Sequence, residues 1–204
     1  MNVRSDSSYV MLIDLFSCSG CHACSVACKA EHRAPIGQFR TRVQTIQSGE
    51  FPSVRKRFVP TLCQHCENAP CLEACPAGAI ERTDLGIVQI AADRCVGSGD
   101  CVSACPYGAI FFSEEEGVAQ KCDFCSDRLE VGMEPACVAT CPTDALKFGS
   151  EEREDIAEIL NSGSFRTQWK PEVTRPRVWY RGLEPETAVA LQRINRDGDE
   201  VKRK

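Results

Sequence analysis

Cysteine is the residue type that most constrains this chain, because 15 of its 204 residues are cysteine. Free thiols at that density are cross-linked, bound to metal, or both. Disulfide frameworks are typical of short secreted chains with an even number of cysteines. Here the number is odd and much of the spacing is a tight C-x-x-C. The cysteines therefore predict metal binding, and a disulfide scaffold is the weaker alternative.

The cysteines fall into four groups with the spacing of iron–sulfur ligands. The groups are Cys18, Cys21, Cys24 and Cys28; Cys63, Cys66, Cys71 and Cys75; Cys95, Cys101 and Cys105; and Cys122, Cys125, Cys137 and Cys141. A C-x2-C-x2-C run can surround three corners of a cubane, and a fourth cysteine, often before proline, reaches the other cluster of a two-cluster ferredoxin. Zinc sites instead use two C-x-x-C pairs roughly fifteen to twenty residues apart. We expect iron–sulfur clusters, with zinc as the alternative.

An internal repeat supports this interpretation. The segments CLEACPAGAI (71–80), CVSACPYGAI (101–110) and CVATCPTDAL (137–146) share one form, a pair of cysteines, a proline and a short apolar end. A unit repeated in this way indicates duplicated ferredoxin halves. The apolar residues of 9–14, 86–90 and 109–112 predict short strands, and residues 151–160 predict a helix. The expected fold class is α+β.

One ligand is missing from the third group. Four cubane clusters with four thiolates each need one more cysteine than the chain has. Aligning the groups places Ser98 at the empty position, and a serine hydroxyl is a far poorer ligand than a thiolate. We expect a [3Fe–4S] cluster here. A [4Fe–4S] cluster held by Ser98 Oγ, one held by Asp100, and a labile fourth iron remain alternatives.

The net charge and the hydropathy of the chain limit the kinds of partner that it can have. The net charge of −5 argues against nucleic acid as the main partner. The first apolar run, residues 9–16, is too short for a membrane span or a signal peptide and is interrupted by Asp14. We therefore expect a chain without an export signal of its own, held at a membrane only through partners. The three histidines, His22, His32 and His65, are expected to be hydrogen-bonding or surface groups rather than ligands.

With these motifs in view, residues 9–150 resemble the four-cluster iron–sulfur subunits of the dimethyl sulfoxide reductase family of molybdenum or tungsten enzymes. The resemblance rests on IDLFSCSGCHACSVACK, LCQHCENAPCLEACP, CVSACPYGAI and QKCDFCSDR. It implies two nested bacterial ferredoxin-like modules with small β-hairpins and short helices. The outer module would comprise residues 1–58 and 117–150, and the inserted module residues 59–116. Outside the resemblance, the composition of residues 151–204 predicts a helix and an extended C-terminal tail packed on the core or on a partner.

The resemblance also implies how the cysteines pair, since the first and last groups share two clusters and the middle groups share the other two. The four ligand sets are Cys18, Cys21, Cys24 and Cys141 (set 1); Cys63, Cys66, Cys71 and Cys105 (set 2); Cys75, Cys95 and Cys101, with Ser98 at the fourth corner (set 3); and Cys28, Cys122, Cys125 and Cys137 (set 4). Sets 1, 2 and 4 would hold [4Fe–4S] clusters and set 3 a [3Fe–4S] cluster, as in family members that lack a cysteine at this position.

The function implied is electron transfer between a molybdopterin-containing catalytic subunit and a membrane quinone-reactive subunit or another carrier. No catalytic residues are expected in the chain itself, and relatives of this design lie on either side of the membrane. A sulfur or arsenic oxyanion is the favoured substrate class of the catalytic subunit. One alternative is a cluster subunit of a hydrogenase or formate–hydrogen-lyase assembly. The other is a zinc- or disulfide-stabilised structural protein.

Overall fold

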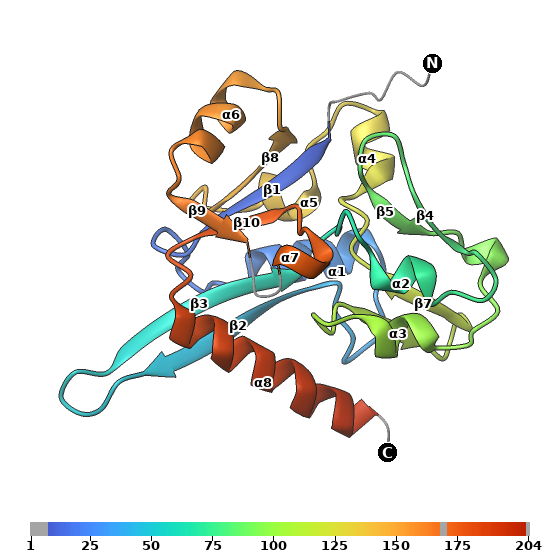
Figure 1. Ribbon diagram of the computed structural model, residues 1–204, viewed down its shortest axis with the longest axis horizontal. Helices are drawn as coiled ribbons and strands as arrows, with labels where there is room; N and C mark the ends of the chain where they lie inside the picture. Colours follow the sequence, from blue (N-terminus) through green and yellow to red (C-terminus); the bar gives the residue numbers. More distant parts are fainter. Residues whose placement is uncertain (1–7, 168–170, 203–204) are drawn as a thin grey trace.

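The computed structural model describes residues 8–167 and 171–202 (Figure 1). Its largest sheet has four strands in the order β8-β1-β10-β9. These strands are β1 (Tyr9–Asp14), β8 (Leu146–Ser150), β9 (Phe165–Thr167) and β10 (Val178–Arg181). Strand β1 is antiparallel to β8 and parallel to β10, so both of its edges are paired. Its apolar residues are also buried on both faces of the sheet, which accounts for the continuous apolar run.

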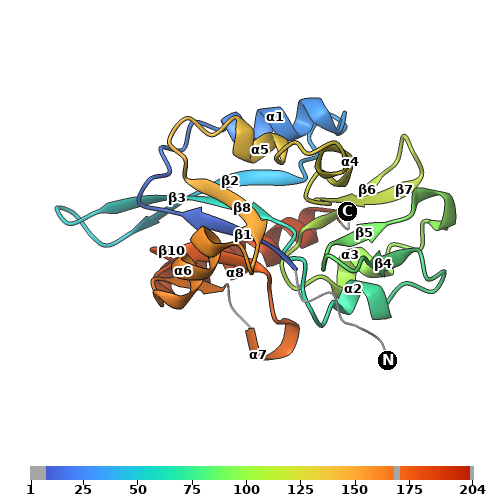
Figure 2. The ribbon, with the colours of Figure 1, turned by 90° about the horizontal axis from the view of Figure 1, so that it is seen from above.

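The two faces of β1 pack on different layers. Val10 and Leu12 contact Ile156 of helix α6 (Glu154–Asn161), whereas Met11 and Ile13 belong to the main hydrophobic core on the opposite face. Figure 2 shows helices α1 (Ala23–Glu31) and α5 (Ala136–Ala139) together on one side of the sheet and α6 on the other. The helix predicted at residues 151–160 is thus confirmed.

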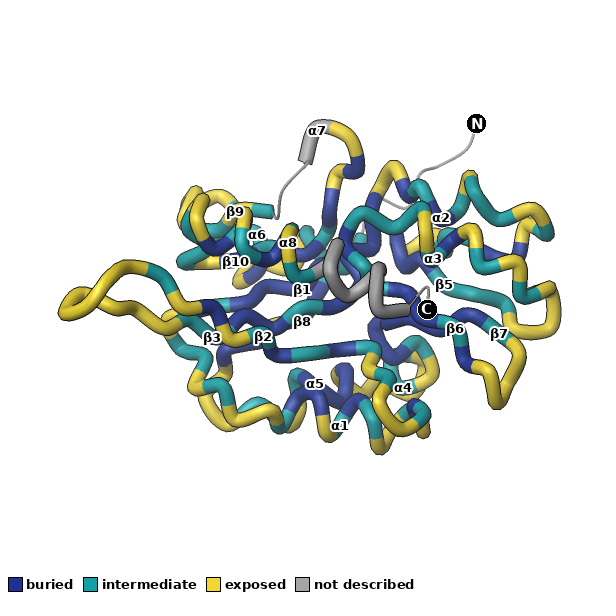
Figure 3. Tube along the Cα trace, turned by 90° about the horizontal axis from the view of Figure 1, so that it is seen from below, coloured by how far each residue is buried: buried dark blue, intermediate teal, exposed yellow. Residues whose placement is uncertain are grey.

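The remaining strands form three antiparallel hairpins. They are β2 (Thr41–Ser48) with β3 (Arg55–Leu62), β4 (Ile80–Arg82) with β5 (Val88–Ile90), and β6 (Ile110–Ser113) with β7 (Val118–Lys121). The long hairpin β2–β3 projects from the body of the molecule, and its turn is exposed (Figures 1 and 3). The predicted strands at 9–14, 86–90 and 109–112 correspond to β1, β5 and β6. With its hairpins and short helices the molecule has the expected α+β class.

The short hairpins have a hydrophobic core of their own. Ile80 and Val88 pack there with Ile110 and Ala119, beside helices α2 (Pro70–Glu73) and α3 (Asp100–Ala104). A single 3₁₀ turn, Ala92–Arg94, precedes the third group of cysteines. Helix α4 (Ser126–Glu130) follows the first two cysteines of the fourth group. None of the helices in the described residues is long and apolar enough to cross a bilayer.

The prediction of an extended C-terminal tail packed on the core or on a partner is right in part, because β9 and β10 are extended and pack on the core, whereas residues 185–202 form a helix. Strand β10 lies inside the main sheet between β1 and β9, and helix α8 (Pro185–Lys202) packs on β2. A third element, helix α7 (Pro171–Thr174), follows β9 and precedes β10 along the chain. The β-branched and aromatic residues of VWY (178–180) favour a strand, and Val178 and Tyr180 are buried there. Residues 1–7, 168–170 and 203–204 of the predicted segments lie outside the described residues.

Candidate metal centres

The first group of cysteines lies in a turn and a helix that follow β1. Cys18 and Cys21 belong to the turn, whereas Cys24 and Cys28 are four residues apart on α1 and so share one face of that helix. Gly20 has a φ of 71°, and a Cβ atom there would lie 2.4 Å from the Phe58 ring. The turn therefore needs glycine both for its left-handed backbone and for the close approach of Phe58.

The internal repeat is a structural unit. In the other three groups a short helix, α2, α3 or α5, carries the first cysteine of each C-x3-C-P motif and ends just before the second. Proline follows that second cysteine and cannot continue the helix. A strand then begins at the apolar end of the repeat, with buried Ile80, Ile110 and Leu146 at its first position.

The alanine of each repeat has a role in the turn. The backbone N–H of Ala79 donates a hydrogen bond to Cys75 Sγ at 3.3 Å. Burial raises the pKa of Cys105, and the corresponding N–H of Ala109 opposes this rise because it donates to the sulfur. Burial also acts to raise the pKa of Cys141, but hydrogen bonds that include the Ala145 N–H outweigh it and lower the pKa. The motif C-P-x-[GD]-A thus folds the chain so that an amide faces the sulfur, which favours the thiolate.

All 15 cysteines lie in the described residues and are free thiols. The structure brings together thiols from distant parts of the chain. Burial raises the pKa of Cys66, and the neighbouring thiolates of Cys63, Cys105 and Cys71 raise it further. Because such thiols repel one another when ionised, holding all of them as thiolates requires a bound cation.

Burial and neighbouring thiolates raise the pKa of cysteines in the other ligand sets as well. In set 1, burial raises the pKa of Cys24 to about 11, and Cys18 and Cys141 add to the shift. In set 3, burial raises the pKa of Cys101, and Cys75 and Cys95 raise it further. In set 4, burial raises the pKa of Cys137, and Cys125 and Cys28 raise it further. Each of these cysteines thus has thiols of its predicted set among its neighbours.

Neighbouring sets also approach one another. Cys137 of set 4 lies near Cys24 of set 1, since the second thiolate raises the pKa of the first. Cys122 of set 4 likewise lies near Cys63 of set 2, since the thiolate of Cys63 raises the pKa of Cys122. Cys71 of set 2 lies near Cys101 of set 3. Contacts between thiols thus link set 1 to set 4, set 4 to set 2, and set 2 to set 3, and we call this series of sets the row.

Burial changes along this row. All four cysteines of set 4 are buried, and in set 2 only Cys105 is partly exposed. Set 1, at one end, has exposed Cys21, and set 3, at the other end, has partly exposed Cys75 and Cys95. The row is therefore enclosed in the middle and reaches the surface at both ends.

Ser98 lies in the turn between Cys95 and Cys101. It is exposed, and its neighbours Gly97 and Gly99 both have positive φ, 71° and 77°. Asp100, the other oxygen ligand considered, is exposed at the first position of α3. The serine thus stands at the outer side of the ligand turn where the first group has a cysteine.

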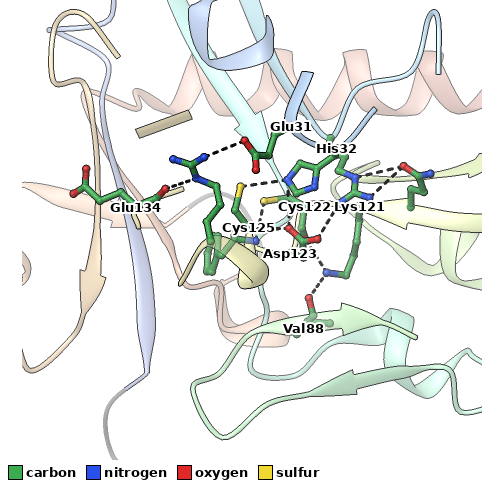
Figure 4. Close-up of polar contacts among 12 residues, drawn as sticks. Glu31, His32, Val88, Lys121, Cys122, Asp123, Cys125 and Glu134 are labelled. Atoms are coloured by element: carbon green, nitrogen blue, oxygen red, sulfur yellow. Dashed lines mark hydrogen bonds and ion pairs between the residues drawn. The ribbon is translucent and has the colours of Figure 1, made fainter. Parts of the chain in front are cut away.

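Polar residues that the spacing of the cysteines did not indicate surround Cys125 (Figure 4). His32 Nε2 lies 3.2 Å from Cys125 Sγ and 3.7 Å from a carboxylate oxygen of Asp123. Asp123 accepts hydrogen bonds of 2.8 Å from Arg40 Nη1 and from the backbone N–H of Cys125. Burial lowers the pKa of His32 although Asp123 opposes it. These side chains orient a ligand residue, the role expected for a histidine here.

A second polar group lies at the start of the motif QKCDFC. Lys121 is 3% exposed, and its Nζ donates to the backbone carbonyls of Val88 and, at 2.8 Å, of Cys122. Fully buried His65 accepts a hydrogen bond of 3.1 Å from the Val88 N–H and stacks on Phe124. The only signal for Lys121 in the sequence is its position directly before a ligand cysteine.

Comparison with known proteins identifies relatives over most of the chain. Residues 54–151 match the family model of the 4Fe-4S dicluster domain. The chain is 49% identical to the thiosulfate reductase electron transfer subunit PhsB of Salmonella typhi over 154 residues, which are 74% of this chain and 80% of the relative. It is 42% identical over 182 residues to a tetrathionate reductase subunit of Salmonella typhimurium, 86% of this chain and 73% of the relative. A putative dimethyl sulfoxide reductase iron-sulfur subunit of Halobacterium salinarum is 40% identical over 179 residues, with coverage of 73% and 68%.

Proposed function

Because this chain belongs to the iron–sulfur electron-transfer subunits of the dimethyl sulfoxide reductase family, we propose that it carries electrons between a molybdopterin-containing catalytic subunit and a membrane quinone-reactive subunit or another redox carrier. The observation that supports this most is the row of thiols, enclosed in the middle and open at both ends. A chain that connects two partners needs a surface contact at each end and protection from water between them.

The donor chemistry fits iron–sulfur clusters. Every set is made of free thiols, and sets 1, 2 and 4 each contain a C-x2-C pair. Soft thiolate ligands select iron–sulfur clusters or zinc. We propose that sets 1, 2 and 4 each hold a [4Fe–4S] cluster and that set 3 holds a [3Fe–4S] cluster. Such clusters supply one-electron redox centres when they are bound. The nested arrangement of two ferredoxin-like modules, 1–58 with 117–150 and 59–116, is part of the same proposal.

The residues of the chain hold and protect these sites. Short helices fix pairs of thiols, backbone amides of the repeat donate to sulfur, and the hydrophobic cores exclude water from sets 2 and 4. Burial, hydrogen bonds and nearby charge are the means by which a protein sets cluster potential. No bond-making residue is needed, so we expect the chain alone to turn over no substrate.

The relatives favour a substrate class for the catalytic partner. Two of them are named as subunits of thiosulfate and tetrathionate reductases. We propose that this chain likewise serves a reductase of sulfur oxyanions and that it reaches the membrane only through its partners. The names of these relatives are those of reductase subunits, which favours this proposal over a hydrogenase or formate–hydrogen-lyase subunit.

The test uses the chain co-purified with its catalytic subunit in the absence of oxygen. After chemical reduction, thiosulfate, tetrathionate or dimethyl sulfoxide is added and the visible absorbance of the clusters is followed. Reoxidation by a sulfur oxyanion, with no response from the chain purified alone, is the expected result. No reoxidation of the clusters by any substrate that the complex itself reduces would contradict the role in electron transfer.

A further inference from the structure

Lys121 is a buried cation at the junction of two hairpins and a ligand turn. It is the last residue of β7, and its side chain reaches to the carbonyl of Val88 in β5 (Figure 4). A second hydrogen bond, of 2.8 Å, goes to the carbonyl of Cys122, the first cysteine of the fourth group. The ammonium is thus held in a fixed place by two backbone oxygens and has almost no contact with solvent.

No carboxylate neutralises this ammonium within the part of the chain that the structure describes, where none of the ion pairs within 4 Å includes Lys121. Two acidic residues close to Lys121 in the sequence have other partners: Asp123 binds Arg40, and Glu116 accepts from Gln120. Burial of an uncompensated charge is strongly unfavourable. The observation calls for a negative charge close to Lys121 that side-chain carboxylates do not supply.

The two backbone oxygens that bind the ammonium belong to a residue of set 4 and to a residue that packs on set 2. Lys121 directly precedes Cys122 of set 4 in the sequence. Val88, whose carbonyl accepts from Lys121, packs with Cys66 and Cys71 of set 2 and lines one cavity with all four cysteines of that set. Burial raises the pKa of Cys71 and Cys105, and the charge of Lys121 opposes both shifts. Cys122 and Cys63 approach each other at the same junction. Lys121 therefore lies where the two enclosed sets of the row meet.

We propose that Lys121 is a fixed positive charge between the clusters of sets 2 and 4, which compensates their negative charge and raises both reduction potentials. The proposal rests on the function proposed above. Reduction adds an electron to an anionic, thiolate-bound cluster, and a nearby cation stabilises the reduced form more than the oxidised form. The effect is large where solvent is excluded, because screening there is weak. Lys121 would thus make reduction of the two enclosed clusters, and so electron transfer through the middle of the row, more favourable.

The experiment compares four forms of the intact complex by EPR-monitored redox titration without oxygen: the natural protein, Lys121→Gln, Lys121→Arg and Lys147→Gln. Glutamine can still donate a hydrogen bond but has no charge, whereas arginine keeps the charge. Lys147 is an exposed lysine of β8 and serves as the matched control.

In Lys121→Gln we expect two [4Fe–4S] clusters to become harder to reduce by about tenfold in the one-electron equilibrium constant, about 59 mV. The third [4Fe–4S] cluster and the [3Fe–4S] cluster should change far less. Lys121→Arg and Lys147→Gln should titrate like the natural protein. Loss of clusters from Lys121→Gln but not from Lys121→Arg would also support the proposal, since it would show that the charge is needed to hold them.

Three results would overturn it. Unchanged potentials in a fully loaded Lys121→Gln complex would show that the charge has no effect, and an equal shift of all four clusters would indicate a general change of structure. Loss of clusters from both variants at position 121 would show that the shape of the lysine side chain, rather than its charge, is needed to hold the clusters. In each case the electron-transfer function would stand, whereas a natural complex without any iron–sulfur cluster would refute the function itself.

Discussion

Two residues, Ser98 and Gly20, determine the properties of their ligand turns. Ser98 does so through its side chain, and Gly20 through the absence of one. Ser98 is exposed between two glycines of positive φ, in a turn that otherwise repeats the cysteine pattern. The sequence alone identifies it, because alignment of the groups leaves one position without a thiol. The structure adds that the position is open to solvent, so a thiol fits there without displacing any part of the core.

Ser98→Cys should therefore complete the fourth corner of set 3. We expect the [3Fe–4S] cluster to become a [4Fe–4S] cluster, with about one more iron atom per chain and a lower reduction potential. Iron analysis and EPR of the oxidised protein measure both effects. An unchanged cluster type in a stable variant would show that the shape of the site, rather than the number of thiolates, excludes the fourth iron.

Gly20 offers a test of the first ligand turn with a matched control. In both Gly20→Ala and Gly78→Ala the alanine must take a left-handed backbone, at a cost of roughly 1–2 kcal/mol. Only at Gly20 would the new Cβ also meet an aromatic ring, that of Phe58 at 2.4 Å, whereas nothing lies within 4 Å at Gly78. We expect Gly20→Ala to lose more iron than Gly78→Ala on anaerobic purification. Equal iron contents would mean that the ring moves away at little cost.

At the scale of elements, the sequence predicts those units that are formed by residues close to one another along the chain. The cysteine repeat indicated each ligand turn, and the apolar runs indicated β1, β5 and β6. Strand β10 could not be found in this way, because its partner β1 is more than 160 positions earlier in the chain. Prolines and arginines around VWY suggested an extended segment, and only the pairing with β1 makes the segment a strand. His32 and Asp123 likewise reach Cys125 through tertiary packing.

The internal position of β10 gives a prediction with a control nearby. Val178 is fully buried in β10, whereas Val173 of α7 is 62% exposed. Val178→Asp places a charge without a partner in the core, and we expect it to lower the free energy of unfolding by roughly 3–5 kcal/mol. Val173→Asp should change it by less than about 0.5 kcal/mol. Anaerobic thermal denaturation measures the difference, and equal stability of the two variants would contradict the sheet order.

At the scale of the whole molecule, the fold places four groups of thiols in a row across two hydrophobic cores. Sets 1 and 4 draw on the start of the chain and on residues beyond 120, so the fold must close before either set is complete. Lys121 and the turn of Cys122 join the two halves at the enclosed middle of the row. The open ends leave set 1 and set 3 available for contact with partner proteins.

An EPR-monitored redox titration of the intact complex, purified without oxygen, tests the central claim of four clusters most directly. The account predicts a [3Fe–4S] signal in the oxidised protein that disappears at relatively high potential, followed by [4Fe–4S] signals that grow as the potential falls. An oxidised sample without a signal, with only [4Fe–4S] signals on reduction, would contradict the assignment at Ser98. The absence of any iron–sulfur signal at every potential would contradict the account as a whole.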